Sequence, residues 1–260
     1  MDRKKVYVCI PVHGAEINVM TLMSVWDIRR SRHDVVVEPS GLSLLARNFN
    51  INWIKAYTGG FDYFVMLHAD VAPLPSGECW VDQLVAACAR YKAAVVSEVL
   101  PIKSHEGTTS TGLITDATNP FSLRRLTTTE LDSLQDGFIC REDLCECFDV
   151  AENVAGPLLI NTGLMAIDLR SFDWAGLEFP GFAIDDAVVW NRSRKPMAYS
   201  QPEDWGMSLW LYEQGLPYYA LKSIPAFHCG FRPFHNREPF GLPTDERGFQ
   251  VSIEDFVKSE

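Results

Sequence analysis

The chain has no long apolar run. No stretch of its 260 residues approaches the roughly 20 apolar residues that a membrane-spanning helix requires. Its first residues, Met1 to Lys5, lead into the segment VYVCIPV, which is too short for the apolar core of a signal peptide and lacks a small-residue cleavage site. We therefore predict a cytoplasmic protein without a membrane segment.

Cysteine pairs with the Cys-x-x-Cys spacing are also missing. The seven cysteines are an odd number scattered along the chain, which indicates reduced thiols rather than a disulfide framework. Cys140, Cys145 and Cys147 do cluster, but their spacing is not that of a zinc site. Unpaired buried or surface thiols are the favoured interpretation.

Positive charge is in the minority, with 23 Lys and Arg against 34 Asp and Glu and a net charge of −11. This balance favours solubility and opposes non-specific adhesion to DNA or anionic membranes, although a local basic site remains compatible with it. Hydrophobic residues make up 47% of the chain and charged residues 22%, as in ordinary globular proteins. The chain is long enough for one large α/β domain with a substantial core.

The first hundred residues alternate between strand-like and helix-like segments. In chain order we expect a strand over 5–12, a helix over 18–30, a strand over 34–41, a helix from Leu42 to Ala56, a strand ending at Leu67, a helix over 81–92 and a strand over 93–100. This alternation predicts a Rossmann-like α/β fold with a mostly parallel central sheet flanked by helices.

The second half of the chain is less regular. Residues 101–120 are rich in Gly, Thr, Ser and Pro, which predicts a long loop. Residues 156–169 are apolar again, residues 203–215 form a helical pattern ended by Gly215, and a last strand is expected to run out to His228. We find no internal repeat and no separating linker, so we predict a single domain over 1–260.

Polar residues follow the predicted strands at the points where the strands end. The stretch FDYFVMLHADVAP, residues 61–73, shows this most clearly, because a buried apolar run stops at an imidazole and a carboxylate. Ligands of open parallel sheets bind outside the carboxyl ends of the strands. The residues expected on that rim are Pro11, Val12, His13 and Gly14; Glu38 and Ser40; His68, Ala69 and Asp70; and Asn161, Thr162 and Gly163.

The order of these motifs resembles that of glycosyltransferases with the GT-A fold. The resemblance runs from about residue 5 to 230 through PVHG, VVEPSG, LLARN, MLHAD, INTGLMAI, PEDWGMSLWLYEQG and a late histidine. The hallmark of that family is Asp-x-Asp at a strand end, where this chain has His68-Ala69-Asp70. The resemblance implies a nucleotide-sugar donor, a UDP-sugar above all, with residues 1–100 as the nucleotide-binding half, 101–230 as the acceptor or catalytic half, and 231–260 as a lid and tail.

The resemblance also implies a divalent metal ion, because the donor leaves as a diphosphate whose charge must be stabilised. Asp70 would be one ligand and His228 a second, while His68 would ligate directly or hold a bound water. A carboxylate with imidazoles favours Mn²⁺, with Mg²⁺ as the alternative. The competing interpretation makes His68 a hydrogen-bonded strand end and Asp70 a turn cap.

A pair of acids, Glu203 and Asp204, begins the late helix. Ser200 and Glu203 have the spacing of a capping box, which would place Ser200 at the N-cap. In inverting members of the resembled family, the acid of such a pair is the catalytic base, which assigns that role to Asp204. We expect the helix N-terminus to keep its pKa low. Two alternatives stay open: both acids only complement the helix dipole, or the reaction is retaining.

The resemblance assigns roles to several further residues. Arg47 is expected to contact the nucleotide or its phosphates, and Glu38 to accept a hydrogen bond from the base. The amide of Asn161 is expected to meet a sugar hydroxyl. Trp205 would form a platform for a sugar ring, although core packing against Leu209 is the favoured alternative.

The segment after His228 is rich in aromatics, Pro and Gly and carries Arg232, His235 and Arg237. It predicts a mobile lid whose cations, Arg232 in particular, meet the diphosphate, with a solvated tail as the alternative. Lys103 and His105, in the 101–120 loop, are expected to shape the acceptor side.

Three hypotheses of function follow. The leading one is a metal-dependent, inverting glycosyltransferase whose acceptor is a soluble sugar, a protein or a hydroxylated nucleic-acid base, the last making it a DNA-modifying enzyme. A sugar nucleotidyltransferase would need a Gly-rich cationic loop after the first strand, whereas PVHGAEINVM has one Gly and no cation. A non-catalytic nucleotide- or sugar-binding module is the third.

Overall fold

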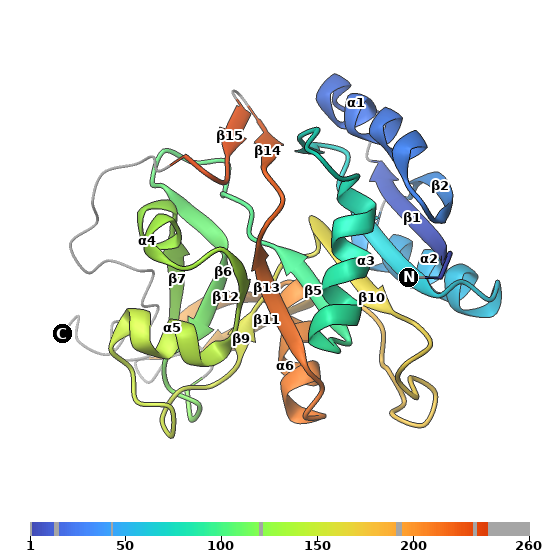
Figure 1. The fold of residues 1–260 in the computed structure, drawn as a ribbon. Helices are drawn as coiled ribbons and strands as arrows, with labels where there is room; N and C mark the ends of the chain where they lie inside the picture. Colours follow the sequence, from blue (N-terminus) through green and yellow to red (C-terminus); the bar gives the residue numbers. More distant parts are fainter. Residues whose placement is uncertain are drawn as a thin grey trace.

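The computed structural model describes residues 2–12, 16–42, 44–119, 122–190, 194–230 and 233–238. Its framework is a seven-stranded sheet of order β2-β1-β3-β10-β5-β13-β8 (Figure 1). The strands are β1 (Lys5–Val12), β2 (Asp34–Gly41), β3 (Tyr63–Leu67), β5 (Val95–Glu98), β8 (Gly137–Ile139), β10 (Leu164–Asp168) and β13 (Tyr218–Lys222). Strands β2, β1, β3, β5 and β13 share one direction, whereas β10 and β8 run against them.

Helices cover both faces of this sheet, as the sequence predicted. They are α1 (Val19–Asp27) with the 3₁₀ turn η1 (Ile28–Arg30), α2 (Leu45–Thr58), α3 (Trp80–Tyr91) and α6 (Glu203–Glu213). Successive residues of β1 point to opposite faces. Tyr7 and Cys9 join a core that includes residues of α2 and α6, whereas Val6 and Val8 join a core with α3 and η1.

The apolar segment 156–169 enters the sheet against the direction of its neighbours. Its strand β10 lies between β3 and β5 and is antiparallel to both, with Leu164 opposite Leu67. The amino end of β10 therefore meets the carboxyl ends of β3 and β5 at one rim. Asn161 to Gly163 reach the predicted rim because they precede an antiparallel strand, not because they end a parallel one.

A second, smaller sheet replaces much of the long loop predicted over 101–120. Strand β6 (Thr108–Ile114) pairs with β7 (Leu123–Thr127) and β9 (Leu158–Leu159), next to α4 (Thr128–Ser133) and α5 (Arg141–Phe148). The loop prediction was wrong for residues 108–114, because the threonines that suggested a loop are β-branched and fit a strand. Thr108, Thr109 and Thr111 are buried there.

The last predicted strand is two strands in different sheets. After β13 the chain turns at Ser223 to Pro225 and forms β14 (Ala226–Cys229), which lies between β4 (Val71–Pro73) and β15 (Pro233–His235). Residues 233–238 of the predicted lid and tail thus belong to a strand and the turn after it. Residues 231–232 and 239–260 lie outside the described residues.

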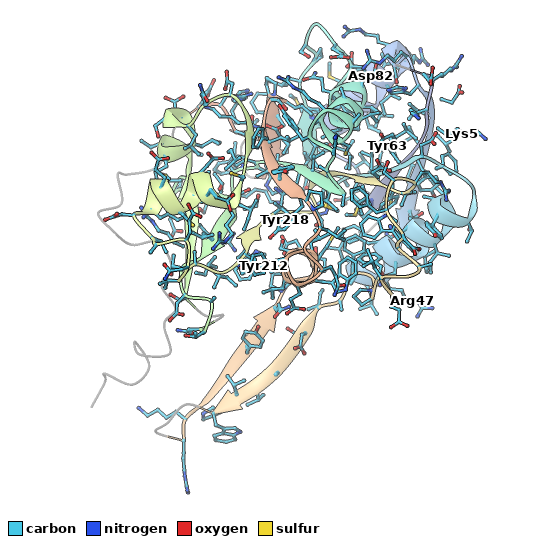
Figure 2. The ribbon with its side chains drawn as sticks, turned by 60° about the horizontal axis from the view of Figure 1, so that its bottom comes forward. Lys5, Arg47, Tyr63, Asp82, Tyr212 and Tyr218 are labelled. Carbon is cyan, nitrogen blue, oxygen red and sulfur yellow. The ribbon has the colours of Figure 1, made fainter. Side chains whose placement is uncertain are left out.

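Two strands stand apart from the body of the molecule. Strands β11 (Asp185–Trp190) and β12 (Pro196–Gln201) form a two-stranded antiparallel ribbon that projects from the start of α6 (Figure 2). Across the described ranges, every helix is too short or too polar to cross a bilayer.

Candidate active site

The tip of β3 is a fixed turn. Its buried run ends at Leu67, and the amide of Val71 donates to the carbonyl of His68 at 3.0 Å, which closes the turn around Ala69 and Asp70. The carbonyl of Ala69 accepts the amide of Asn18 at 2.8 Å. Because the first turn of α1 is tied to it in this way, the backbone that carries His68 and Asp70 is held from two sides.

Strand pairing brings His228 to Asp70. Strand β4 starts directly after Asp70, and β14 pairs with it so that His228 lies opposite Val71. The amide of Cys229 donates to the carbonyl of Asp70 at 2.7 Å, and Nε2 of His228 lies 3.7 Å from Oδ1 of Asp70. The two residues that the resemblance assigned to one metal site, far apart in the chain, therefore face each other.

A lysine completes this cluster. Nζ of Lys103 lies 2.5 Å from Oδ2 of Asp70. A Cβ on Gly230 would stand 3.0 Å from Cδ of Lys103, so the bare glycine leaves room for the lysine stem. Burial by itself raises the pKa of Asp70, but His228 and Lys103 outweigh it and hold that pKa below its usual range. Asp70 is therefore ionised at any physiological pH.

The geometry around Asp70 fits a divalent cation with few protein ligands. Nδ1 of His228 donates to the carbonyl of Pro101 at 2.8 Å, which directs Nε2 toward Asp70, the arrangement usual for ligating histidines. A cation at about 2.1 Å from each ligand sets the ligand atoms about 3 to 4 Å apart, which the 3.7 Å separation satisfies. No cluster of three or more His, Cys, Asp or Glu suited to a metal occurs among the described residues.

Phosphate and water oxygens would therefore complete the coordination, as they commonly do for Mg²⁺-type sites. Cys140, Cys145 and Cys147 are free thiols, and they form no metal-binding cluster with other described residues.

His68 contacts a different set of residues from Asp70. Its half-buried ring stacks on Phe49 at 5.6 Å, and desolvation lowers its pKa to about 4, so the imidazole is neutral at pH 7. Nε2 lies 3.3 Å from the hydroxyl of Thr162, which donates to Oε1 of Glu203 at 3.1 Å. Because the hydroxyl proton goes to Glu203, Nε2 of His68 donates to Thr162 and Nδ1 keeps its lone pair.

The side chain of Asn161 is hydrogen-bonded to backbone groups at this rim. The amide side chain of Asn161 donates to the carbonyl of Glu98 at 2.8 Å and accepts from the amide of Gly163 at 2.9 Å. Asn161, which the resemblance assigned to a sugar hydroxyl, is 4% exposed and engaged with the backbone. A Cβ on Gly163 would lie 2.6 Å from Cδ1 of Leu100, so any larger residue there would require the Leu100 side chain to move.

The start of α6 differs from the predicted capping box. Ser200 lies in β12 opposite Asp186, and the N-cap of α6 is Pro202, without a side-chain cap. The extended ribbon runs through Gln201 and keeps Ser200 out of the cap, which is why that prediction was wrong. Glu203 instead turns its buried carboxylate to Thr162.

Asp204 has an environment of its own. Its Oδ1 accepts the amide of Trp205 at 2.8 Å. Burial first and the charge of Glu203 second raise its pKa to about 7, against the opposing effects of the Trp205 amide and Arg125. The expectation of a low pKa was wrong because desolvation exceeds the effect of the helix N-terminus here.

Trp205 lies between a cation and an apolar cluster. The guanidinium of Arg125 sits 4.7 Å from its ring centre and also donates to the carbonyl of Thr109 at 3.3 Å. Trp205 and Leu209 pack against a small core of Ile114, Leu123 and Leu159. Packing with Leu209 therefore accounts for Trp205. Arg125, a residue without a signal of its own in the sequence, faces Trp205 beside Asp204.

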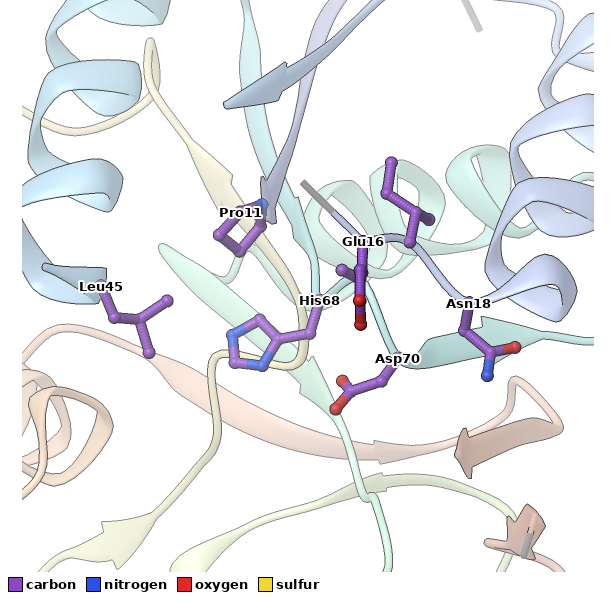
Figure 3. A pocket seen from close by; sticks show the side chains of 8 residues that line it. Pro11, Glu16, Asn18, Leu45, His68 and Asp70 are labelled. Carbon is purple, nitrogen blue, oxygen red and sulfur yellow. The ribbon is translucent and has the colours of Figure 1, made fainter. Parts of the chain in front are cut away.

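A pocket of about 490 Å³ opens next to the strand tip (Figure 3). Figure 3 shows the imidazole of His68 and the carboxylate of Asp70 pointing into the same space, with Leu45 on the far side of His68. The lining residues are Pro11, Glu16, Ile17, Asn18, Leu45, His68, Ala69 and Asp70. Glu16 was missed from the sequence, where it carries no signal beyond its place in the loop after the first strand.

The remaining predicted donor residues lie away from this pocket or outside the described residues. Glu38 accepts from the hydroxyl of Tyr7 at 2.5 Å and pairs with Lys55, and the carbonyl of Ser40 accepts from the side chain of Asn48 at 2.6 Å. Arg47 is exposed and points outward from α2 (Figure 2). Val12 is buried at the end of β1, and His13, Gly14 and Arg232 lie outside the described residues.

No protein-family model matches the chain, and no curated protein matches its sequence. Among solved structures, the crystal structure of A197 from STIV is similar with a TM-score of 0.52 and 15% identity, covering 92% of this chain and 95% of that one. A Bacillus anthracis protein assigned as a glucose-1-phosphate thymidylyltransferase, crystallised with sucrose, gives a TM-score of 0.41 and 10% identity over 86% of this chain and 89% of that one. At these identities the first likeness concerns the fold alone, and the second is too low to support a conclusion.

Proposed function

We propose that the chain is a metal-dependent glycosyltransferase of the GT-A type, which moves a sugar from a nucleotide-sugar, a UDP-sugar above all, to an acceptor hydroxyl. The observation that carries the proposal is the meeting of Asp70 and His228 at the carboxyl end of β3, beside a pocket of about 490 Å³. A pocket of this size suits a small-molecule ligand. The position is also where open α/β sheets bind ligands.

On the donor side, Asp70 and His228 would hold Mn²⁺ or Mg²⁺, which supplies Lewis-acid stabilisation of the leaving diphosphate when bound. Lys103 adds a positive charge 2.5 Å from Asp70, within reach of the same phosphates after a change of side-chain rotamer. A lysine on a flexible stem is suited to follow a leaving group in this way.

On the acceptor side, Asp204 is the proposed base. The carboxylate of Glu203 accepts a hydrogen bond from the hydroxyl of Thr162. Among the described residues, the carboxylate of Asp204 accepts from backbone amides only, chiefly that of Trp205, which leaves it available to an acceptor. A base works best when its pKa lies near the working pH, and the pKa of Asp204 is about 7. Accepting the proton of the acceptor hydroxyl at Asp204 would let that oxygen attack from the side opposite the diphosphate, which inverts the sugar.

His68 acts as a positioning residue in this proposal. Its neutral ring donates to Thr162, which in turn holds Glu203 at the first residue of α6. This chain of hydrogen bonds joins the donor strand β3 to the helix that presents Asp204. In the His-Ala-Asp motif a histidine therefore stands in place of the first acid of Asp-x-Asp, and this histidine links β3 to the proposed acceptor side.

The test uses the purified full chain with Mn²⁺ and a panel of nucleotide-sugars, following release of nucleoside diphosphate. We expect slow hydrolysis of one donor class, loss of that activity in Asp70→Asn and in His228→Ala, and no loss in the matched control Asp116→Asn, a half-buried turn carboxylate that accepts hydrogen bonds from Thr118. Tight nucleotide-sugar binding without any turnover would replace the enzyme with a binding module, and the absence of both would refute the proposal.

A further inference from the structure

The ribbon of β11 and β12, called the arm below, has one fully exposed face. Opposite residues in its register are Asp186 with Ser200, Val188 with Ala198, and Trp190 with Pro196, and each such pair lies on one side of the ribbon. All six of these residues are exposed, with Val188 and Trp190 each 66% exposed. The other side of the arm is partly covered at Val189, Tyr199 and Gln201.

This open face is apolar where it lies farthest from the body of the molecule. Val188 with Ala198 and Trp190 with Pro196 form two neighbouring cross-strand pairs on this face, and all four side chains are apolar. A two-stranded ribbon alone is marginally stable in water, and its free edges invite further pairing. Contiguous exposed apolar residues of this kind mark interaction surfaces.

Charge on the arm is divided between its two ends. Asp185 and Asp186 lie where β11 leaves the body, whereas Arg194 and Lys195 lie at the tip, just before β12. All four residues are exposed. A second arm laid antiparallel on the first would therefore set its cationic tip over the acidic end of its partner, twice by symmetry.

We propose that the arm is a dimerisation element, and that its open face packs on the same face of a second copy of this chain about a two-fold axis. The face is self-complementary in both respects that such isologous contacts need, with an apolar centre that matches itself and charged ends that match each other. This inference is independent of the proposed glycosyl transfer, since it concerns neither the strand tip nor Asp204.

The contact is small. Two strands of six residues give a face about 20 Å long and about 10 Å wide, so arm packing alone buries a few hundred Å², below the roughly 1,200 Å² of a stable specific interface. The dimer is accordingly expected to be weak and reversible. The tip alone also suits a nucleic-acid groove, but the apolar face, the acidic end of the arm and the net charge of −11 favour a second copy.

The first experiment is sedimentation velocity of the full chain over a wide concentration series at low and high salt. We expect a monomer–dimer equilibrium that weakens with salt, as exposed ion pairs are screened. Trp190→Ser should weaken dimerisation by about thirtyfold or more, as for a central aromatic anchor. The matched control is Trp26→Ser on α1, a tryptophan with 64% exposure, which should dimerise as the unmodified protein does.

The second experiment exchanges the charged ends. Asp186→Lys and Arg194→Asp should each weaken the dimer by about three- to tenfold, because each leaves like charges facing one another, and the double variant should restore it. A monomer at every concentration would overturn the proposal, as would dimers indifferent to Trp190→Ser. A monomer that binds duplex DNA through Trp190 and Arg194 would also overturn it and make the arm a nucleic-acid element.

Discussion

Three titratable side chains near the rim of the sheet have pKa values shifted from their ordinary ones. Contacts with His228 and Lys103 lower the pKa of Asp70, desolvation lowers that of His68 to about 4, and burial raises that of Asp204 to about 7. At neutral pH one is an anion, one is neutral and one is poised between its two forms. Perturbation in opposite directions within one region is typical of catalytic sites.

The pH dependence of turnover tests the role of Asp204. A base must be deprotonated to accept a proton, so the rate should rise with pH through about 7. Asp204→Asn should lower the rate by about a hundredfold or more and abolish that rise. The measurement is a rate profile from acid to alkaline pH. Glu203→Gln is the comparison, which should keep the rise but move it to lower pH, because the charge of Glu203 raises the pKa of Asp204. A profile that stays flat in the unmodified protein would remove Asp204 from the chemistry.

Replacing Lys103 separates its two proposed effects. Lys103 competes with a metal ion for Asp70, so Lys103→Met should bind Mn²⁺ several-fold more tightly. Turnover should nevertheless fall by about tenfold or more, because the leaving diphosphate loses a positive charge. Calorimetry with Mn²⁺ and a rate assay give the two readouts, and Lys5→Met, at an exposed lysine, serves as control. Weaker Mn²⁺ binding and unchanged turnover would contradict both effects.

At the scale of elements, the site depends on the joint between β10 and α6. Thr162 precedes β10 and holds Glu203 at the start of α6 through a buried hydroxyl. This contact ties the segment before β10 to the first residue of the helix that carries the proposed base, in addition to the apolar packing of Met207 and Leu211 in the core.

Removing the hydroxyl of Thr162 should lower the stability of the protein by more than the small size of the group suggests. Thr162→Val keeps the shape but leaves the buried carboxylate of Glu203 without its donor, so we expect a loss of about 1–3 kcal/mol in the free energy of unfolding. Denaturant unfolding measures it. Thr162→Ser, which keeps a hydroxyl, should lose much less, and equal losses in the two variants would show that the hydrogen bond is unimportant.

Elements with a local signal were predictable and those defined by partners were not. Strands β1 and β3 are continuous apolar runs, and α2 and α6 show helical spacing, so their positions followed from the sequence. The direction of β10 depends on its neighbours β3 and β5, which no local pattern encodes. In β6 the buried threonines looked like loop residues, and in β12 strand pairing overrode the capping box at Ser200.

At the scale of the whole molecule, the candidate site joins segments that lie far apart in the chain. His228 arrives beside Asp70 because β14 adds to the short strand β4 that follows the turn. The sequence predicted this pairing only through the resemblance, since neither β4 nor the break between β13 and β14 has a signal of its own. Lys103 likewise enters from the connection between β5 and β6, which was predicted as loop without a ranked role.

We propose for the molecule as a whole that Asp70 at the strand tip and the late His228 together bind a cation that carries a nucleotide diphosphate. Isothermal titration of the protein with UDP, in the presence and absence of Mn²⁺, tests this most directly. We predict binding that is at least about tenfold tighter with Mn²⁺ and a metal effect that disappears in both Asp70→Asn and His228→Ala. Nucleotide affinity unchanged by Mn²⁺, or a metal effect that survives both substitutions, would contradict the claim.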